Sequence, residues 1–179
     1  MLTDLQRRKM TRFFRVYDIN GSGFIEESDY MRIAHNFAQM RGFKPSSTEY
    51  ARLETKFQFV WDYMRKFGDP NRDYSVSLEE FLAYASSVME DNYAAVEGST
   101  GNFLFELIDG DSDGRITLDE FRLFYRGYDI QDTVVDHIFR KLDLNADSVI
   151  SAEEFSQLGY DFHHSDDPDS PANWFFGPF

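Results

Sequence analysis

Residues 109–120 read DGDSDGRITLDE, and this stretch decides the fold. Aspartates occupy its first, third and fifth positions, Gly114 occupies the sixth, and Glu120 ends it at the twelfth. A hard divalent cation requires a cage of about seven oxygen ligands, and this spacing supplies them from one loop between two helices. We therefore predict a calcium site here. Its ligands are the side chains of Asp109, Asp111, Asp113 and Glu120 and the backbone carbonyl of Arg115.

The same pattern occurs three more times along the chain. The first loop, 18–29, reads DINGSGFIEESD; the second, 69–80, reads DPNRDYSVSLEE; the fourth, 143–154, reads DLNADSVISAEE. Alignment with the third loop, 109–120, assigns metal ligands to each. They are Asp18, Asn20, Ser22, the Phe24 carbonyl, Glu26 and Asp29 in the first loop, Asp69, Asn71, Asp73, Ser75 and Glu80 in the second, and Asp143, Asn145, Asp147, the Val149 carbonyl and Glu154 in the fourth.

Three loops depart from the full pattern. Asp29 replaces Glu at the twelfth position of the first loop, and because a shorter side chain reaches a bidentate geometry less easily, magnesium should compete with calcium there. Ser148 replaces Gly at the sixth position of the fourth loop, with modest strain. The second loop has Tyr74 at this position, a bulky residue that resists a positive φ, and Arg72 adds a positive charge. We expect three or four bound calcium ions, with the second loop undecided.

The negative charge of the chain is concentrated in these loops. The net charge is −14, from 18 Lys plus Arg and 32 Asp plus Glu, and the four loops hold 17 of the acidic and two of the basic residues. Their net charge is therefore −15, and the rest of the chain carries +1. Such acidity argues against nucleic acid and membranes as partners. With no membrane-spanning apolar run and no visible secretory signal, we expect a cytoplasmic protein.

Apolar residues before each loop predict an entering helix. Before the first loop Tyr17, Phe14, Phe13 and Met10 stand at the spacing of one helix face. The eighth loop position is β-branched throughout, which lets two loops join through a short strand. These residues are Ile25, Val76, Ile116 and Ile150. Because one helix–loop–helix unit cannot bury its apolar stripe alone, we expect the first loop to pair with the second and the third with the fourth.

The predicted fold is therefore all-α, with four EF-hand helix–loop–helix units in two pairs that form one compact globule. We place the first pair in residues 1–95, the second in 96–160, and an aromatic C-terminal tail, packed on the core, in 161–179. Gly42 and the stretch 98–101 are expected to separate successive units. A capping box of Ser46 and Glu49 is expected to begin the second entering helix.

The tail carries the most specific likeness to a known family. It contains YDF at 160–162, SDDPDS at 165–170 and NWFFGP at 173–178. Together with the four loops and Asp29, these residues make the chain resemble the invertebrate sarcoplasmic calcium-binding proteins and the bacterial calerythrin-like proteins. The resemblance implies a compact calcium and magnesium buffer, with metal in the first, third and fourth loops. The resemblance also implies that the second loop binds no metal. In this sequence the second loop has a nearly complete ligand set, so this implication is less safely carried over.

Two other functions stay open beside the buffer, which would need no obligatory protein partner and would be a monomer. A sensor would open and grip a target helix, but such proteins favour Met-rich grooves, and residues 90–179 contain no Met. A calcium-triggered photoprotein would hold coelenterazine in an aromatic cavity and would use His and Tyr. The candidate histidines are His35, His137, His163 and His164. Catalysis is not needed to explain any motif, so we expect no enzyme.

Overall fold

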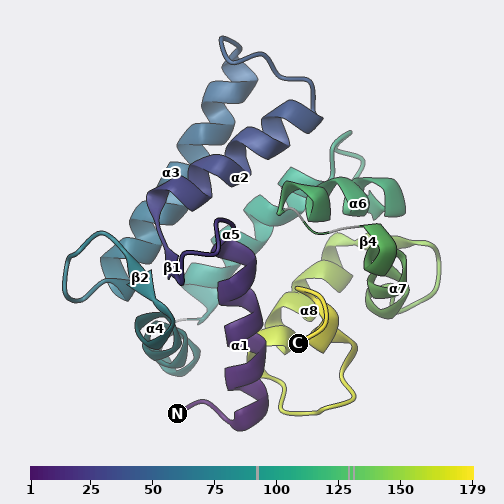
Figure 1. The fold of residues 1–179 in the computed structure, drawn as a ribbon. Coiled ribbons are helices and arrows are strands. Elements are labelled where there is room, and N and C mark those ends of the chain that lie inside the picture. Colours follow the sequence, from purple (N-terminus) through teal and green to yellow (C-terminus); the bar gives the residue numbers. More distant parts are fainter. Residues whose placement is uncertain (92, 129, 131) are drawn as a thin grey trace.

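The computed structural model describes the backbone of residues 1–91, 93–128, 130 and 132–179, and the side chains of 1–87, 101–128, 130 and 134–179. In this part of the chain the elements are mainly helical, with short strands between them (Figure 1). In chain order they are α1 (Asp4–Tyr17), β1 (Phe24–Ile25), α2 (Glu27–Met40), α3 (Thr48–Gly68), β2 (Val76–Ser77), α4 (Leu78–Asp91), α5 (Tyr93–Ile108), β3 (Arg115–Thr117), α6 (Leu118–Gly127), α7 (Asp132–Leu142), β4 (Val149–Ser151), α8 (Ala152–His164) and the 3₁₀ helix η1 (Pro171–Trp174).

The loops pair as the β-branched eighth positions predict. β1 and β2 are antiparallel with Ile25 opposite Val76, and β3 and β4 are antiparallel with Ile116 opposite Ile150. All four side chains are fully buried, so each pair of loops is joined by two backbone strands and two apolar side chains. The predicted all-α EF-hand architecture of helix–loop–helix units in two pairs is confirmed.

Helices that leave the loops begin with caps drawn from the loop residues themselves. Thr117 and Ser151, at ninth positions, accept hydrogen bonds from the backbone N–H of Glu120 and Glu154, and these glutamates bond back to the cap residues. This reciprocal capping box satisfies N–H groups that a helix start leaves unpaired. The local sequence that forms each loop therefore also sets the direction of its exiting helix.

Two helix boundaries differ from the prediction. The cap of α3 is Ser47, whose hydroxyl accepts from Tyr50 N at 3.1 Å, and not Ser46, because a turn from Lys44 O to Ser47 N places the later serine at the helix start. The stretch 98–101 does not interrupt the helical structure, since α5 runs through it. A glycine inside a helix is unfavourable by only about 1 kcal/mol relative to alanine, which an apolar helix end at 103–108 can outweigh.

Helix α2 joins the two pairs of units. It packs against α3 within its own pair and against α6 of the other pair. Its Phe37 ring is 6.1 Å from Phe57 of α3 and 5.9 Å from both Phe124 of α6 and Tyr128, measured between ring centroids. Such aromatic contacts add about 0.5–1.5 kcal/mol each beyond their area burial. The core therefore runs without interruption between the pairs.

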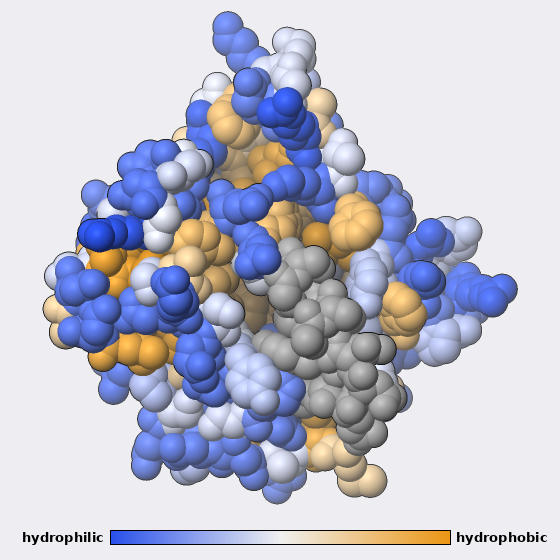
Figure 2. Space-filling view, turned by 180° about the vertical axis from the view of Figure 1, so that it is seen from behind, coloured by the Kyte–Doolittle hydropathy of each residue, from blue (hydrophilic) through white to orange (hydrophobic). Residues whose placement is uncertain are grey.

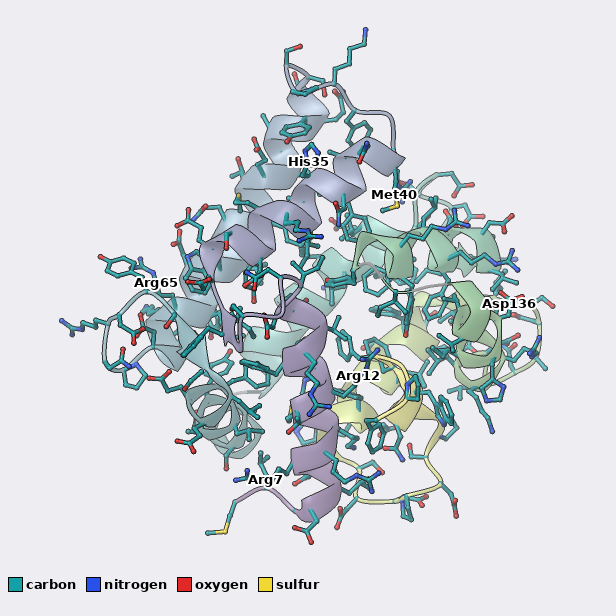
Figure 3. All side chains as sticks on the ribbon, viewed as in Figure 1. Arg7, Arg12, His35, Met40, Arg65 and Asp136 are labelled. Atoms are coloured by element: carbon teal, nitrogen blue, oxygen red, sulfur yellow. The ribbon has the colours of Figure 1, made fainter. Side chains whose placement is uncertain are left out.

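The C-terminal tail lies against α1 and the second pair of units. Phe175 and Phe176 are 7% and 4% exposed, and the Phe176 ring stacks on Phe13 of α1 with centroids 4.4 Å apart. Nε of Arg12 donates to the Phe176 carbonyl at 2.8 Å, and Figure 3 shows Arg12 on α1 beside the C-terminal segment. Tyr125 of α6 donates from its hydroxyl to the Phe175 carbonyl at 2.9 Å. The tail thus fastens the first helix to the last units.

Lys9 of α1 strengthens this contact from a buried position. Its side chain is fully buried, and Nζ donates to the Ser165 carbonyl at 2.7 Å while lying 5.6 Å from the Phe162 ring centroid. Burial lowers the pKa of Lys9 from 10.5 to about 8, although the carboxylates of Asp166 and Asp161 act in the opposite direction. The ammonium group is therefore less favoured in the folded protein than in the unfolded chain.

This shift predicts a rise of stability with pH. Between pH 8 and 10.5 the unfolded chain holds the Lys9 proton more tightly than the folded protein, so the free energy of unfolding increases with pH across this window. In urea unfolding, we expect the wild type to gain stability relative to Lys9→Met from pH 8 to 10, because other titrating groups cancel in the difference. A difference that stays constant with pH would contradict the assignment.

The described residues of the rear face are mainly hydrophilic (Figure 2). The rear face in Figure 2 shows apolar residues in separate areas among hydrophilic ones. The large exposed hydrophobic side chains include Phe59 and Phe67 of α3, with 66% and 50% of their area exposed. Within the described residues, no helix combines the length and the apolar character that a membrane span requires.

Candidate metal centres

All four loops hold their first aspartate in the same way. The two carboxylate oxygens of Asp109 accept hydrogen bonds from the backbone N–H of Asp113 at 3.2 Å and of Gly114 at 3.0 Å. The equivalent bonds, from the fifth and sixth residues to the first, are present in the other loops at 2.9–3.2 Å and end on Asp18, Asp69 and Asp143. The first ligand is therefore aimed into each loop by the backbone itself.

The third and fifth positions continue this arrangement. In the third loop Asp111 accepts from Asp113 N at 3.2 Å, and Asp113 accepts from Arg115 N at 2.9 Å. The corresponding bonds of the first, second and fourth loops measure 2.7–3.2 Å. Their acceptors are Asn20 and Ser22, Asn71 and Asp73, and Asn145 and Asp147. Oxygens from the predicted ligand positions thus line the inside of every loop.

Each loop turns through left-handed backbone at its fourth and sixth residues. Gly23 and Gly114 take the sixth position with φ of 89° and 83°, and Tyr74 and Ser148 adopt it with φ of 67° and 72°. The fourth positions have φ of 59–70° and are Gly21, Arg72, Ser112 and Ala146. A left-handed conformation is unfavourable by about 1–2 kcal/mol for a residue other than glycine. The second and fourth loops accept this strain and keep the shape of the others.

Tyr74 is accommodated because its side chain points out of the second loop. The ring is 65% exposed, and the guanidinium of Arg65 lies 4.8 Å from its centroid. A cation–π contact at an exposed site is worth about 0.5–1 kcal/mol and offsets part of the backbone strain. Although a bulky residue resists a positive φ, the second loop forms with the bonds to its first, third and fifth residues that the other loops have. It differs at Oε1 of Glu80, which accepts from Nδ2 of Asn71 at 2.9 Å, because Pro70 has no N–H to donate.

The twelfth residue closes each loop. In the third loop, Oε2 of Glu120 accepts from both the N–H and the hydroxyl of Thr117, and Oε1 accepts from Gly110 N at 2.8 Å. Although burial raises the pKa of Glu120, these hydrogen bonds outweigh it and lower the pKa overall, which keeps the carboxylate ionised. Glu80 and Glu154 are held by the same kind of bonds from Ser77 and Ser151.

The first loop closes on a shorter and more buried carboxylate. Asp29 is fully buried and accepts from Glu26 N at 2.8 Å and from Asn20 N at 3.3 Å. Burial raises the pKa of Asp29, while these backbone bonds oppose the shift. The ninth residue, Glu26, carries a carboxylate where the other three loops have a hydroxyl. This loop therefore combines a shorter twelfth side chain with an additional acid.

The third loop brings three carboxylates together. Carboxylate oxygens of Asp109, Asp111 and Glu120 lie within 4.8 Å of one another, the one such convergence of acidic or histidine side chains among the described residues. The other loops carry Asn at the third position, and the first also carries Ser at the fifth. Oxygen donors of this kind fit calcium or magnesium and fit soft metals poorly. The arrangement fits a hard divalent cation.

Two features of these loops could not be predicted from the sequence. The left-handed fourth residue has no side-chain signature, since Arg72, Ser112 and Ala146 share nothing but the conformation. The backbone N–H groups that orient the acids are equally silent in the sequence, because every residue except proline carries one. Only Gly21, at the fourth position of the first loop, offered a signal.

Comparison with known proteins places the chain among calcium-binding helix–loop–helix proteins. A family model described as an EF-hand domain pair matches residues 7–86 and 102–158. The luciferin-binding protein of Renilla reniformis is 32% identical and covers 96% of this chain and 92% of its own length. Calerythrin of Saccharopolyspora erythraea is 23% identical, with coverage of 91% and 94%. The sarcoplasmic calcium-binding protein alpha chain of Penaeus vannamei is 26% identical, with coverage of 91% and 90%.

A solved structure extends this likeness to the whole fold. The calcium-loaded apo form of the coelenterazine-binding protein from Renilla muelleri matches with a TM-score of 0.77 and 27% identity. The match covers 99% of this chain and all of that one. The likeness therefore includes the tail as well as the four loops.

Proposed function

Since this chain belongs to the EF-hand domain pair family and is a calcium-binding protein related to the sarcoplasmic calcium-binding proteins and calerythrin, we propose that it buffers calcium in the cytoplasm with four metal centres. The hydrogen bonds that hold the first, third and fifth residues are shared by all four loops and support the count of four. The proposed ligands are those of the first, third, fifth, seventh and twelfth positions of each loop, with Glu26 added in the first.

The mechanism follows from charge. A bound divalent cation supplies positive charge and polarises the oxygens around it. Four such ions would change the net charge of the protein from −14 to −6 and relieve the repulsion between acids crowded into each loop. The twelfth carboxylate lies in the first turn of the exiting helix, so a contact between metal and Glu120 or Glu154 also fixes the angle of α6 or α8.

Burial of the aromatic tail is the observation that favours a buffer over a sensor. A sensor exposes an apolar groove when calcium binds and grips a target helix in it. In this protein Phe175 and Phe176 already lie in the apolar interior between α1, α6 and α8, held by Arg12 and Tyr125. A target would have to displace these contacts first. We therefore propose a monomer that stays closed and has no obligatory protein partner.

Hydrogen exchange tests the closed state. We expect amides of residues 165–179 to exchange equally slowly in the calcium and the magnesium forms of the full chain, because the tail covers the core in both. Residues 48–54, at the distant start of α3, provide an internal reference in the same experiment. Faster exchange of the tail in calcium, together with higher calcium affinity in the presence of a target protein, would favour the sensor instead.

Replacement of Asp29 by Glu tests metal selection in the first loop. The longer side chain can bind a large cation through both oxygens, whereas magnesium prefers a compact octahedral site. We expect Asp29→Glu to weaken the competition of magnesium with one calcium ion by about tenfold, the lower end of the change that even supporting contacts around a metal produce. Titration of calcium at fixed magnesium measures this shift, and Asp4→Glu is the matched control outside the loops. Unchanged or stronger competition would contradict the role of Asp29.

Binding of coelenterazine is a second candidate function. It is favoured by the 32% identity with a luciferin-binding protein over almost the whole chain. The interior also holds polar aromatic groups, including the buried hydroxyls of Tyr17 and Tyr128, whose oxygens are 3.2 Å apart. A ligand of this kind could use such hydroxyls for hydrogen bonds within an otherwise apolar interior.

The histidines give the photoprotein less support. His163 and His164 make hydrogen bonds one helical turn back along α8, to Gly159 O and Tyr160 O. His35 lies on α2, with its Nδ1 3.1 Å from the Tyr50 hydroxyl, at an exposed site. Addition of coelenterazine to calcium-free protein tests both functions. A stoichiometric absorption change supports a carrier, and light on addition of calcium supports a photoprotein. If neither signal is observed, coelenterazine binding is contradicted.

A further inference from the structure

One helix connects the first loop to the third. α2 begins at Glu27, where Glu26 and Asp29 of the first loop form its capping box, and ends at Met40 beside α6 (Figure 3). Gly42, with φ of 69°, ends the helix: its N–H donates to Gln39 O, and the next N–H, of Phe43, donates to Ala38 O. These two hydrogen bonds form a Schellman motif, which fixes the end of the helix. It places Arg41 at a defined position facing the second pair of units.

Arg41 reaches the entry of the third loop. Its Nη2 donates to the carbonyl of Leu107 at 2.8 Å and to the carbonyl of Ile108 at 3.0 Å. These are the last carbonyls of α5, immediately before Asp109, and the C-terminus of a helix leaves such groups without partners in the helix. An arginine from the first EF-hand pair thus caps the helix that carries the first ligand of the third loop.

The second residue of the third loop is small where this guanidinium packs. The other loops carry Ile19, Pro70 and Leu144 at the second position, whereas the third carries Gly110. A side chain at Gly110 would collide with Nη1 of Arg41. The space that a side chain at the second position of the third loop would need is therefore taken by Arg41. Gly110 also donates its N–H to Oε1 of Glu120, so the peptide against which Arg41 packs orients the twelfth ligand.

A second contact holds α2 on the exit of the same unit. Nδ2 of Asn36 donates to the Gly127 carbonyl at the end of α6 at 3.0 Å, and a side chain at Gly127 would collide with the Phe37 ring. Both helices that flank the third loop therefore rest on α2, α5 through Arg41 and α6 through Asn36 and Phe37. The position of the third loop depends on a helix that starts at the first.

We propose that Arg41 is a positioning residue of the third metal centre, supplied by the other EF-hand pair. This inference rests on the proposed metal site at 109–120. Arg41 acts by geometry: its planar fork holds the end of α5 and the Gly110 peptide, so that Asp109 and Glu120 face the ion. Its charge acts in the opposite direction, because a nearby cation disfavours a second one. The two effects have opposite signs in calcium affinity and can be separated.

Three variants separate geometry from charge. Arg41→Ala removes both, Arg41→Lys keeps the charge but loses the fork, and Gly110→Ala keeps the charge but displaces the guanidinium. We expect Arg41→Lys and Gly110→Ala to lower the calcium affinity of one ion by about tenfold, as for other supporting contacts around metal ligands, and to speed its dissociation. Arg41→Ala should lower this affinity by less, because loss of the charge offsets part of the loss of the contact. Gly159→Ala is the matched control, since a methyl group there meets no atom within 4 Å. Fluorescence-detected calcium titration and stopped-flow release into a chelator measure both quantities.

A double-mutant cycle tests whether the two residues act as one unit. In the Arg41→Ala background, Gly110→Ala should have little further effect, since the atom it displaces is gone. Losses that simply add would contradict the proposal, as would a rise in affinity with Arg41→Ala that Arg41→Lys reverses, which would mean that charge alone matters. Circular dichroism and thermal unfolding of each variant show that the fold is retained, and Gly110→Ala keeps the test valid if Arg41→Ala proves unstable.

A substitution that abolishes the third metal site tests the role of Arg41 separately from the existence of that site. In a Glu120→Gln background the third ion is absent, so Arg41→Ala should leave the affinities of the remaining ions unchanged. If Glu120→Gln removes no ion, the metal site at 109–120 is wrong. If Glu120→Gln removes one ion but Arg41→Ala and Gly110→Ala do not alter that ion, only the role of Arg41 is wrong.

Discussion

Replacement of Glu120 by Gln is expected to remove one calcium ion from the protein. Gln keeps the size of the side chain but loses the charge and the second strong oxygen ligand, and both oxygens of Glu120 are already aimed into the loop by Gly110 and Thr117. Because supporting contacts around a metal are worth 10–100-fold, loss of a direct bidentate ligand should lower the affinity of this site by at least about 100-fold. Calorimetric titration measures the missing ion.

Glu106→Gln is the matched control for this experiment. Glu106 lies on the same unit, on α5, and makes an exposed ion pair with Lys56 at 3.0 Å, outside the loop. An exposed pair contributes about 0–1 kcal/mol, so this variant should keep every calcium ion and nearly all the stability of the wild type. If Glu106→Gln and Glu120→Gln lowered calcium binding equally, the loss would report general acidity and not a ligand.

Of the variants proposed here, Phe176→Ala is expected to lower the free energy of unfolding the most. The ring is 4% exposed, stacks on Phe13 and lies 5.1 Å from Phe162 between centroids, so its removal leaves a cavity between α1, α8 and the tail. Deletion of a buried Phe side chain lowers the free energy of unfolding by about 3–5 kcal/mol. Urea unfolding in saturating calcium measures the change.

Phe179→Ala provides the comparison within the same tail. Its ring is 38% exposed and contacts Arg8 at 5.1 Å from the centroid. Substitutions at such surface positions usually change stability by about 0.5 kcal/mol or less, so this variant should remain close to the wild type. Equal losses at positions 176 and 179, or a negligible loss at 176, would contradict a tail packed in the core.

The parts of the structure that could be predicted are those carried by side-chain chemistry. Acids at alternate positions, a β-branched eighth residue and apolar helix faces each point to a single local structure, and the loops, their pairing and the helices agree with them. The aromatic tail was expected on the core because an exposed patch of that size invites aggregation, and Phe175 and Phe176 are buried.

The parts that could not be predicted depend on backbone or on distant residues. The cap of α3 moved from Ser46 to Ser47 because a turn after Lys44 decides it, and a serine at either position reads alike. The weak helix breakers at 98–101 were outweighed in α5. Nothing in the local sequence relates Arg41 to Gly110, which is 69 residues away. Such contacts are visible only after the chain has folded.

The count of calcium ions per chain tests the central claim most directly, namely that the acidity of this protein is one metal site repeated four times. Isothermal titration calorimetry of metal-free protein, in the absence of magnesium, is expected to show four bound calcium ions, because the first, third and fifth residues of the second loop are held as in the other three despite Tyr74. In the same titration Glu80→Gln should reduce the count to three. A wild-type count of three or fewer would contradict the claim.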